Sequence, residues 1–154
     1  MTTLVLSLCM LAAPGPPAVS EPVPIVGDWD LNLSRTHYGP GVEGRKSERF
    51  TCKESAGHVE CVIRSVRSDG RALVGSFRAA LDGAVSPVAG MPGMDEVRLQ
   101  PHASGVLNAV FGLRGTPVFA YRAYQSADGR SLMIVSIDPG SGKALNSVVV
   151  YDRH

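Results

Sequence analysis

The stretch "DPGSGKA" at 138–144 has residue types and spacing that could do chemistry, because a glycine-rich turn before a lysine can cradle a phosphate. A phosphate-binding loop needs a glycine five residues before the glycine of its Gly-Lys pair, and a serine or threonine after the lysine. Ile137 and Ala144 occupy these two positions. We therefore interpret the stretch as a hairpin turn.

Other patterns of catalytic or metal-binding residues are also missing from the sequence. There is no Gly-x-Ser-x-Gly nucleophile motif and no paired carboxylate motif. No pair of histidines has the spacing of a metal site among the four in the chain, which are His37, His58, His102 and His154. We expect a protein that is not an enzyme and has no cofactor or metal.

The charge of the chain indicates no polyanionic partner. The net charge is +1, so we expect neither nucleic acid nor an anionic membrane surface as a partner. The basic residues of the first third are expected to form a solvated face; they are Arg35, Arg45, Lys46, Arg49 and Lys53.

Residues 1–20 have the pattern of a secretory signal peptide. They contain no charged side chain, carry an apolar run from Leu4 to Ala13, and end in Ala18-Val19-Ser20, a sequence suited to signal peptidase. The run of about ten residues is too short for a membrane-spanning helix, which needs about 20. We expect no membrane span, and a cleaved, secreted or periplasmic protein.

The remaining residues, 21–154, predict a single all-β domain. Short alternating runs are separated by turn signals, including Asp-Gly at 69–70, 82–83 and 128–129. The expected strands are 27–33, 46–54, 58–66, 72–81, 95–100, 105–113, 117–124, 131–138 and 145–152. We expect an antiparallel up-and-down meander of about eight or nine strands closed into a barrel, with a β-sandwich as the alternative. Closure is favoured because it removes exposed strand edges.

The stretch "FTCKESAGHVECVIR" predicts a disulfide between adjacent strands. A two-residue turn at Ala56-Gly57 places Cys52 directly opposite Cys61, in a pair without backbone hydrogen bonds, where side chains are closest. These two are the cysteines that remain once residues 1–20 are removed. Their spacing is unlike C-x-x-C, so we expect a structural bond.

The sole tryptophan lies in the first expected strand, in Gly27-Asp28-Trp29. Alternation places Trp29, Leu31 and Leu33 on one inward face, with Trp29 closing one end of the core and Gly27 leaving room where the chain enters. In this motif the chain resembles the lipocalins and the wider calycin group. That resemblance implies a Trp-capped barrel base and an arginine from a late strand over the tryptophan, for which Arg122 and Arg153 are both candidates.

A closer resemblance is to small exported bacterial barrel proteins of lipocalin-like type. These share a Gly-x-Trp-x-Leu-Asn opening, a central Asp-Gly followed by Pro-Val-x-Gly, and a late Ser-x-Asp-Gly turn. The chain matches these motifs at 27–32, at 82–83 with 87–90, and at 126–129. The resemblance implies a barrel that binds something apolar and supplies no catalytic residues.

The segment 83–96 is a Gly/Pro-rich connection that carries Met91 and Met94. We expect it to cover the open barrel end, opposite or beside the base that Trp29 closes, where flexible methionines could contact a ligand or could simply close the end. Interior positions are expected at Leu107, Phe111, Phe119, Tyr121, Met133 and Val135. The candidate ligand-binding residues are Met91, Met94, Phe111 and Tyr121, although a small barrel can also be filled by its own side chains.

Two other functions stay open. The signal peptide, the Gly-x-Trp strand and the disulfide-bonded hairpin also resemble, more weakly, periplasmic barrel inhibitors of secreted metalloproteases. That alternative implies a protein partner bound at exterior loops or at the N-terminal residues 21–25. The other alternative is an envelope protein with no ligand.

Overall fold

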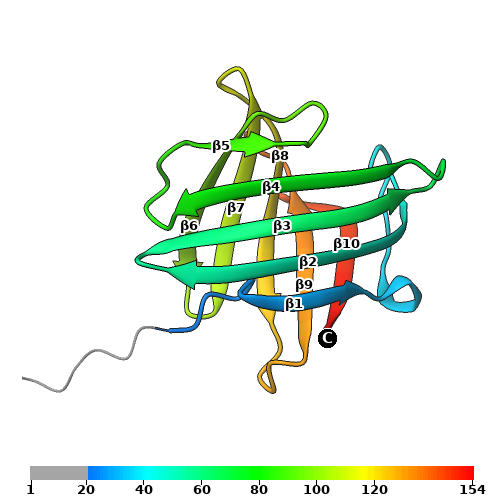
Figure 1. The fold of residues 1–154 in the computed structure, drawn as a ribbon, viewed down its shortest axis with the longest axis horizontal. Helices are drawn as coiled ribbons and strands as arrows, with labels where there is room; N and C mark the ends of the chain where they lie inside the picture. Colours follow the sequence, from blue (N-terminus) through cyan, green and yellow to red (C-terminus); the bar gives the residue numbers. More distant parts are fainter. Residues whose placement is uncertain (1–20) are drawn as a thin grey trace, which may run out of the picture.

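A computed structural model describes residues 21–154 of the chain, and the signal peptide expected at 1–20 lies outside the described residues. Within residues 21–154, ten antiparallel strands close into one barrel (Figure 1). The strands are β1 (Gly27–Leu31), β2 (Arg45–Ser55), β3 (His58–Arg67), β4 (Ala72–Ala80), β5 (Ser86–Ala89), β6 (Glu96–Ala103), β7 (Val106–Leu113), β8 (Thr116–Gln125), β9 (Ser131–Ile137) and β10 (Ala144–Arg153).

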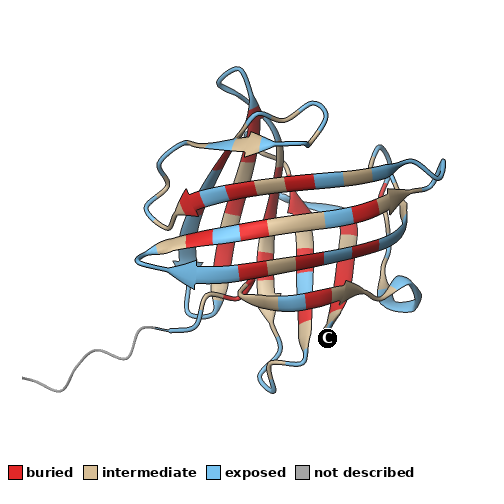
Figure 2. Ribbon diagram, viewed as in Figure 1, coloured by how far each residue is buried: buried red, intermediate tan, exposed pale blue. Residues whose placement is uncertain are grey.

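The expected up-and-down closed barrel is confirmed. Each strand pairs with its neighbours along the chain, and β1 pairs with β10 to complete the circle. Figure 1 shows β1 to β4 crossing β6 to β10 at a steep angle, so the barrel has two strongly twisted halves. Buried residues alternate with exposed ones along β2, β3 and β4 (Figure 2), as expected for strands with one face in a core.

The segment 83–96 contains a tenth strand, which corrects its interpretation as a plain connection. β5 pairs Val88 with Phe77 of β4 and Pro87 with Glu96 of β6. The turn before β5 lies at the same barrel end as the β2–β3 turn, because His58 pairs with Ala80. Residues 90–95 therefore lie at the opposite end, and this part alone of the segment can cover that end.

The first strand is shorter than expected. It ends at Leu31, and the chain continues into a 3-10 helix, η1 (Leu33–Arg35), which begins where the Asn32 side chain accepts a hydrogen bond from the Arg35 backbone N–H. Leu33 is consequently 49% exposed and is not an inward residue. No helix in the described part of the chain is long and apolar enough to cross a membrane.

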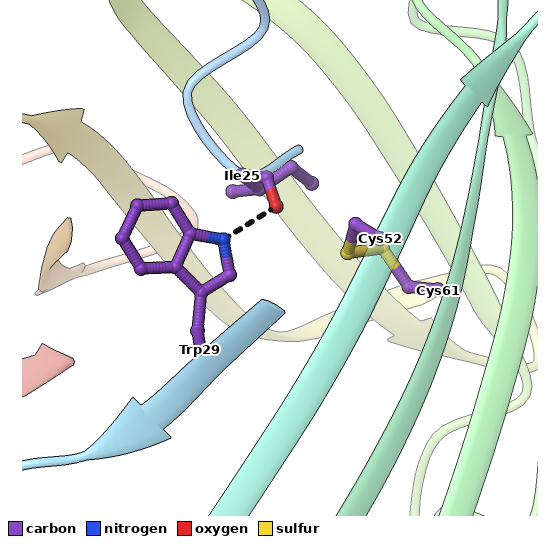
Figure 3. The surroundings of a disulfide bond; sticks show 4 residues. All are labelled: Ile25, Trp29, Cys52 and Cys61. Carbon is purple, nitrogen blue, oxygen red and sulfur yellow. Dashed lines mark hydrogen bonds between the residues drawn. A yellow bond between two sulfur atoms is a disulfide. The ribbon is translucent and has the colours of Figure 1, made fainter. Parts of the chain in front are cut away.

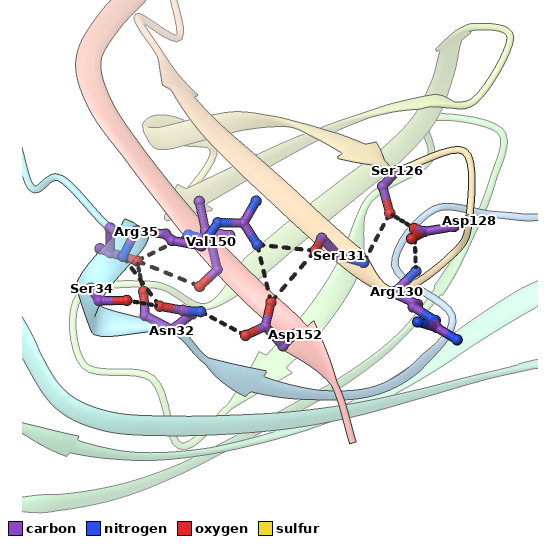
Figure 4. Close-up of polar contacts among 10 residues, drawn as sticks. Asn32, Ser34, Arg35, Ser126, Asp128, Arg130, Ser131, Val150 and Asp152 are labelled. Atoms are coloured by element: carbon purple, nitrogen blue, oxygen red, sulfur yellow. Dashed lines mark hydrogen bonds and ion pairs between the residues drawn. The ribbon is translucent and has the colours of Figure 1, made fainter.

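A polar network holds η1 against the outside of the barrel (Figure 4). Asn32 Nδ2 donates to Asp152 Oδ2 at 2.6 Å, and Arg35 Nη1 donates to Asp152 Oδ1 at 3.2 Å. Arg35 Nη1 also donates to Ser131 Oγ at 3.1 Å. The chain leaving β1 is thus tied to β9 and β10 before it turns back to start β2.

The disulfide between Cys52 and Cys61 is present, and the register predicted for its hairpin is confirmed. Ser55 pairs with His58 across the turn, and Cys52 pairs with Cys61. Ala56 and Gly57 have φ values of 50° and 73°, the left-handed pair that a tight two-residue hairpin turn requires. Both cysteines are buried, so the bond lies inside the barrel.

The expected inward face of β9 is wrong by one residue. Met133 is 40% exposed and Val135 is only partly buried, whereas Leu132, Ile134 and Ser136 point inward. The strand reads "SLMIVSI", in which both faces carry apolar residues over four positions. Alternation therefore does not distinguish its two faces, and a one-residue shift exchanges them.

Candidate functional site

One end of the barrel is closed by Trp29. Its side chain is fully buried, and its indole Nε1 donates a hydrogen bond to the backbone oxygen of Ile25 at 3.0 Å (Figure 3). Ile25 is itself 1% exposed, so the residues before β1 fold under the barrel. The buried tryptophan has its polar atom satisfied, as expected.

The arginine that covers Trp29 is Arg153, which decides between the two candidates. Its guanidinium carbon lies 4.4 Å from the centre of the indole ring, because Trp29 and Arg153 are register partners in β1 and β10. A side chain on Gly27 would collide with the Arg153 guanidinium, and the φ of Gly27 is 140°. Gly27 is therefore needed both for this backbone conformation and for the space that Arg153 fills.

A cavity of about 100 Å³ lies inside the barrel. Its walls are mostly aromatic and aliphatic, and Ile25 and the two cysteines of the disulfide contribute to its lining. The structure brings all four candidate ligand-binding residues together in this lining: Met91, Met94, Phe111 and Tyr121. Phe111 packs against Phe77, Phe119 and Tyr121 with ring centres 5.9, 6.1 and 6.0 Å away.

A wider space of about 320 Å³ adjoins the cavity at the end of the barrel away from Trp29. It is lined by the 41–45 segment and by Met91, Pro92 and Met94, and it shares Ile63, Phe119 and the two methionines with the inner cavity. We call this space the vestibule. The segment 90–95 therefore lines this space, at the barrel end opposite the Trp-capped base.

Met91 packs closely against β4 at Gly75, which has no side chain to block it. A Cβ placed on Gly75 would lie 2.6 Å from Cγ of Met91, so this close contact requires glycine. The Met91 side chain lines both the inner cavity and the vestibule. Because methionine is unbranched and flexible, it can change rotamer at the entrance without moving the strands.

An ion pair faces the cavity from β2. Arg45 Nε lies 3.0 Å from Glu48 Oε2, and the Tyr151 hydroxyl donates to Glu48 Oε1 at 2.6 Å. The pKa of Arg45 is raised above its usual value. Burial acts to lower this pKa, but the Glu48 carboxylate and the oxygens of Tyr151 and Tyr38 act more strongly in the opposite direction. Burial also raises the pKa values of Tyr121 and Tyr151, so both hydroxyls keep their protons.

Sequence reasoning missed this polar group and placed Arg45 on a solvated face. The register of β2 shifts between Arg45 and Ser47, so a bulge brings Arg45 to the same side as Glu48 although they are three residues apart. Strict alternation cannot predict that change. The inward positions of Glu48 and Phe50, however, could have been inferred, because they lie four and two residues before Cys52 and so share its face of the strand.

No group of three or more His, Cys, Asp or Glu residues within 21–154 is arranged to hold a metal ion. Comparison of the chain with known protein families, with characterised proteins and with solved structures finds no match. The inference of function therefore rests on the geometry of the barrel.

Proposed function

We propose that this chain is a non-enzymatic, exported, lipocalin-like protein that binds a small apolar molecule inside its barrel. The observation that supports this best is the inner cavity, which has walls of aromatic and methionine side chains and shares lining residues with the vestibule at one end. Trp29 closes the other end. Concave apolar sites with few polar groups are typical of small-molecule binding.

Entry is expected past Met91 and Met94. Both methionines line the inner cavity and the vestibule, and they lie on the 90–95 connection between β5 and β6 rather than on a long strand. A ligand passing between these side chains would exchange contacts with water for contacts with Phe111 and the aromatic rings packed against it, which are Phe77, Phe119 and Tyr121. Burial of its apolar surface would stabilise the complex by about 25 cal/mol per Å² before the costs of association.

The packing of residues 21–25 argues against the alternative function as a protease inhibitor. Ile25 is buried under the barrel and accepts the hydrogen bond from Trp29. Ser104 Oγ donates to Glu21 Oε1 at 2.7 Å, so the start of the described chain also contacts the β6–β7 turn. A segment held in this way is poorly placed to extend into the cleft of another protein.

The test is titration of delipidated protein with apolar fluorescent probes and with fatty acids. Ile63 lines both the cavity and the vestibule, so Ile63→Trp should fill the passage between them and abolish saturable one-to-one binding. Val74 is 59% exposed on the neighbouring strand β4, and Val74→Trp is the matched control that should bind like the unmodified protein. Shortening the whole 83–96 segment is unsuitable, because it would remove β5.

Equal binding by the unmodified protein and Ile63→Trp would show that the probe binds elsewhere. No saturable binding by any of the three proteins would refute the proposal and favour the protein-partner or ligand-free alternatives. Native mass spectrometry of the protein isolated from its own host would then distinguish those two, by showing a bound protein or none.

A further inference from the structure

We propose that the ligand of the inner cavity is a small uncharged molecule with a compact apolar body and one oxygen that hydrogen-bonds inside the barrel. This inference rests on the proposed function and specifies the class of ligand. It excludes fatty acids and other carboxylates as occupants of the inner cavity, and it excludes ammonium ions as well.

The first argument is the balance of charge in the lining. Arg45 and Glu48 are the charged residues that line the inner cavity, and they pair with each other at 3.0 Å. The second oxygen of Glu48 accepts the hydrogen bond from Tyr151. The cavity thus has no net charge, and the carboxylate already has a partner on each oxygen.

The vestibule repeats this balance. The charged residues that it adds to its lining are Glu43 and Arg67, and Arg67 Nε donates to Glu43 Oε1 at 2.6 Å. A carboxylate entering the barrel would therefore meet arginines that are already paired, together with two carboxylates of its own sign. A cation would meet carboxylates that are already paired, together with two arginines of its own sign. In both cases a charge would be removed from water without a free counter-charge, which is strongly unfavourable.

The second argument concerns the hydroxyl groups in the wall. Tyr121 of β8 and Ser136 of β9 are register partners, and both line the inner cavity. The Tyr121 hydroxyl is protonated near neutral pH, and burial raises its pKa further above 10.0, so it can donate a hydrogen bond to an uncharged acceptor. A ligand with one alcohol, carbonyl or ether oxygen matches this pair.

The third argument is size. An engineered apolar cavity of about 150 Å³ in another protein holds benzene. The inner cavity here is about 100 Å³ and adjoins the vestibule, with which it shares lining residues, so it suits one ring or a short branched chain with a substituent directed toward the vestibule. A long acyl chain exceeds it.

Four molecules of similar shape test the charge argument: toluene, benzyl alcohol, benzoate and benzylammonium. Affinities are measured near neutral pH by calorimetry and by ligand-observed NMR. We expect benzyl alcohol to bind best, and benzoate and benzylammonium to bind at least about tenfold more weakly, a ratio that corresponds to about 1.4 kcal/mol. Benzoate or benzylammonium binding as tightly as benzyl alcohol would overturn this inference alone. Absence of binding by all four, together with all the probes above, would overturn the proposed function and this inference with it.

Two variants test the residues. In Glu48→Gln the amide can still accept a hydrogen bond from Tyr151, but Arg45 loses its counter-charge, so the affinity for benzoate relative to benzyl alcohol should rise at least about tenfold. In Tyr121→Phe the donor is lost, so the affinity for benzyl alcohol relative to toluene should fall about threefold to tenfold.

Circular dichroism and thiol titration establish that each variant is folded with its disulfide closed. If Glu48→Gln does not fold, the series on the unmodified protein and on Tyr121→Phe still decides the matter. An unchanged ratio of benzyl alcohol to toluene in Tyr121→Phe would contradict the assigned donor.

Discussion

Replacing Trp29 by alanine should cost about 3–5 kcal/mol of the free energy of unfolding, the range for deleting a large buried aromatic side chain. Trp29 is fully buried at the closed end of the barrel. A buried aromatic side chain removes about 150–250 Å² from water, which at about 25 cal/mol per Å² amounts to about 4–6 kcal/mol as an upper bound. The hydrogen bond to Ile25 and the contact with Arg153 are lost in the same step.

Equilibrium unfolding in urea, followed by far-ultraviolet circular dichroism with the disulfide intact, measures this loss. Circular dichroism is required because Trp29 is the only tryptophan and its fluorescence disappears with the substitution. Trp29→Phe is the matched variant. It keeps an aromatic ring but leaves the Ile25 carbonyl without its donor, so it should cost about 1–3 kcal/mol.

A loss below about 1 kcal/mol for Trp29→Ala, with an unchanged slope against urea, would refute the placement of this side chain in the sealed base. An equal loss in Trp29→Ala and Trp29→Phe would instead show that the hydrogen bond, rather than the buried area, accounts for the effect. Together the two variants distinguish the contribution of the buried aromatic area from that of the hydrogen bond between Trp29 and Ile25.

Three further predictions concern other parts of the chain. Replacing Cys52 and Cys61 together by alanine should lower the free energy of unfolding by about 2.5–3 kcal/mol, on the chain-entropy model for a loop of about ten residues. Urea unfolding measures this loss. Titration of two free thiols in exported protein that is denatured without reduction would contradict the disulfide itself. The pKa of Asp30 is lowered from 3.8, chiefly by its hydrogen bond from Arg49, so its contribution to stability is present above about pH 4 and is lost as the pH falls further. Asp30→Asn should therefore weaken the fold near neutral pH and change little near pH 2, and equal effects at both would argue against this pairing. The exported protein should begin at or near Glu21, and recovery of Met1 by N-terminal sequencing of the accumulated protein would contradict the signal peptide.

Most of the fold could be predicted because the sequence alternates clearly and marks its turns. The Ala56-Gly57 turn determined the register of β2 and β3, and that register determined the disulfide. β5 escaped prediction for a physical reason. It has four residues, includes Pro87, and pairs through only two residues on each side, so its existence depends on the neighbouring strands β4 and β6 rather than on its own pattern.

The cavity was partly predictable. Phe111 and Tyr121 follow from alternation, and Met91 and Met94 from their place in a Gly/Pro-rich connection. The Arg45–Glu48 pair depends on a bulge, and its contact with Tyr151 depends on closure of the barrel, which brings β2 and β10 to the same interior. Assigning Arg153 rather than Arg122 to Trp29 required the register of β1 on β10.

The pairing of β1 with β10 also bears on how the chain reaches its native state. Trp29 leaves the ribosome well before its register partner Arg153, which lies 124 residues further along the chain. The β2–β3 hairpin is local and can form early, but the base of the barrel joins segments with a very large sequence separation, and such contacts slow folding. Until β10 arrives, the indole and the edge of β1 are exposed together, which makes the incomplete chain prone to aggregation. Substitutions that weaken the meeting of these two strands should therefore reduce the yield of folded protein more than their effect on equilibrium stability would suggest.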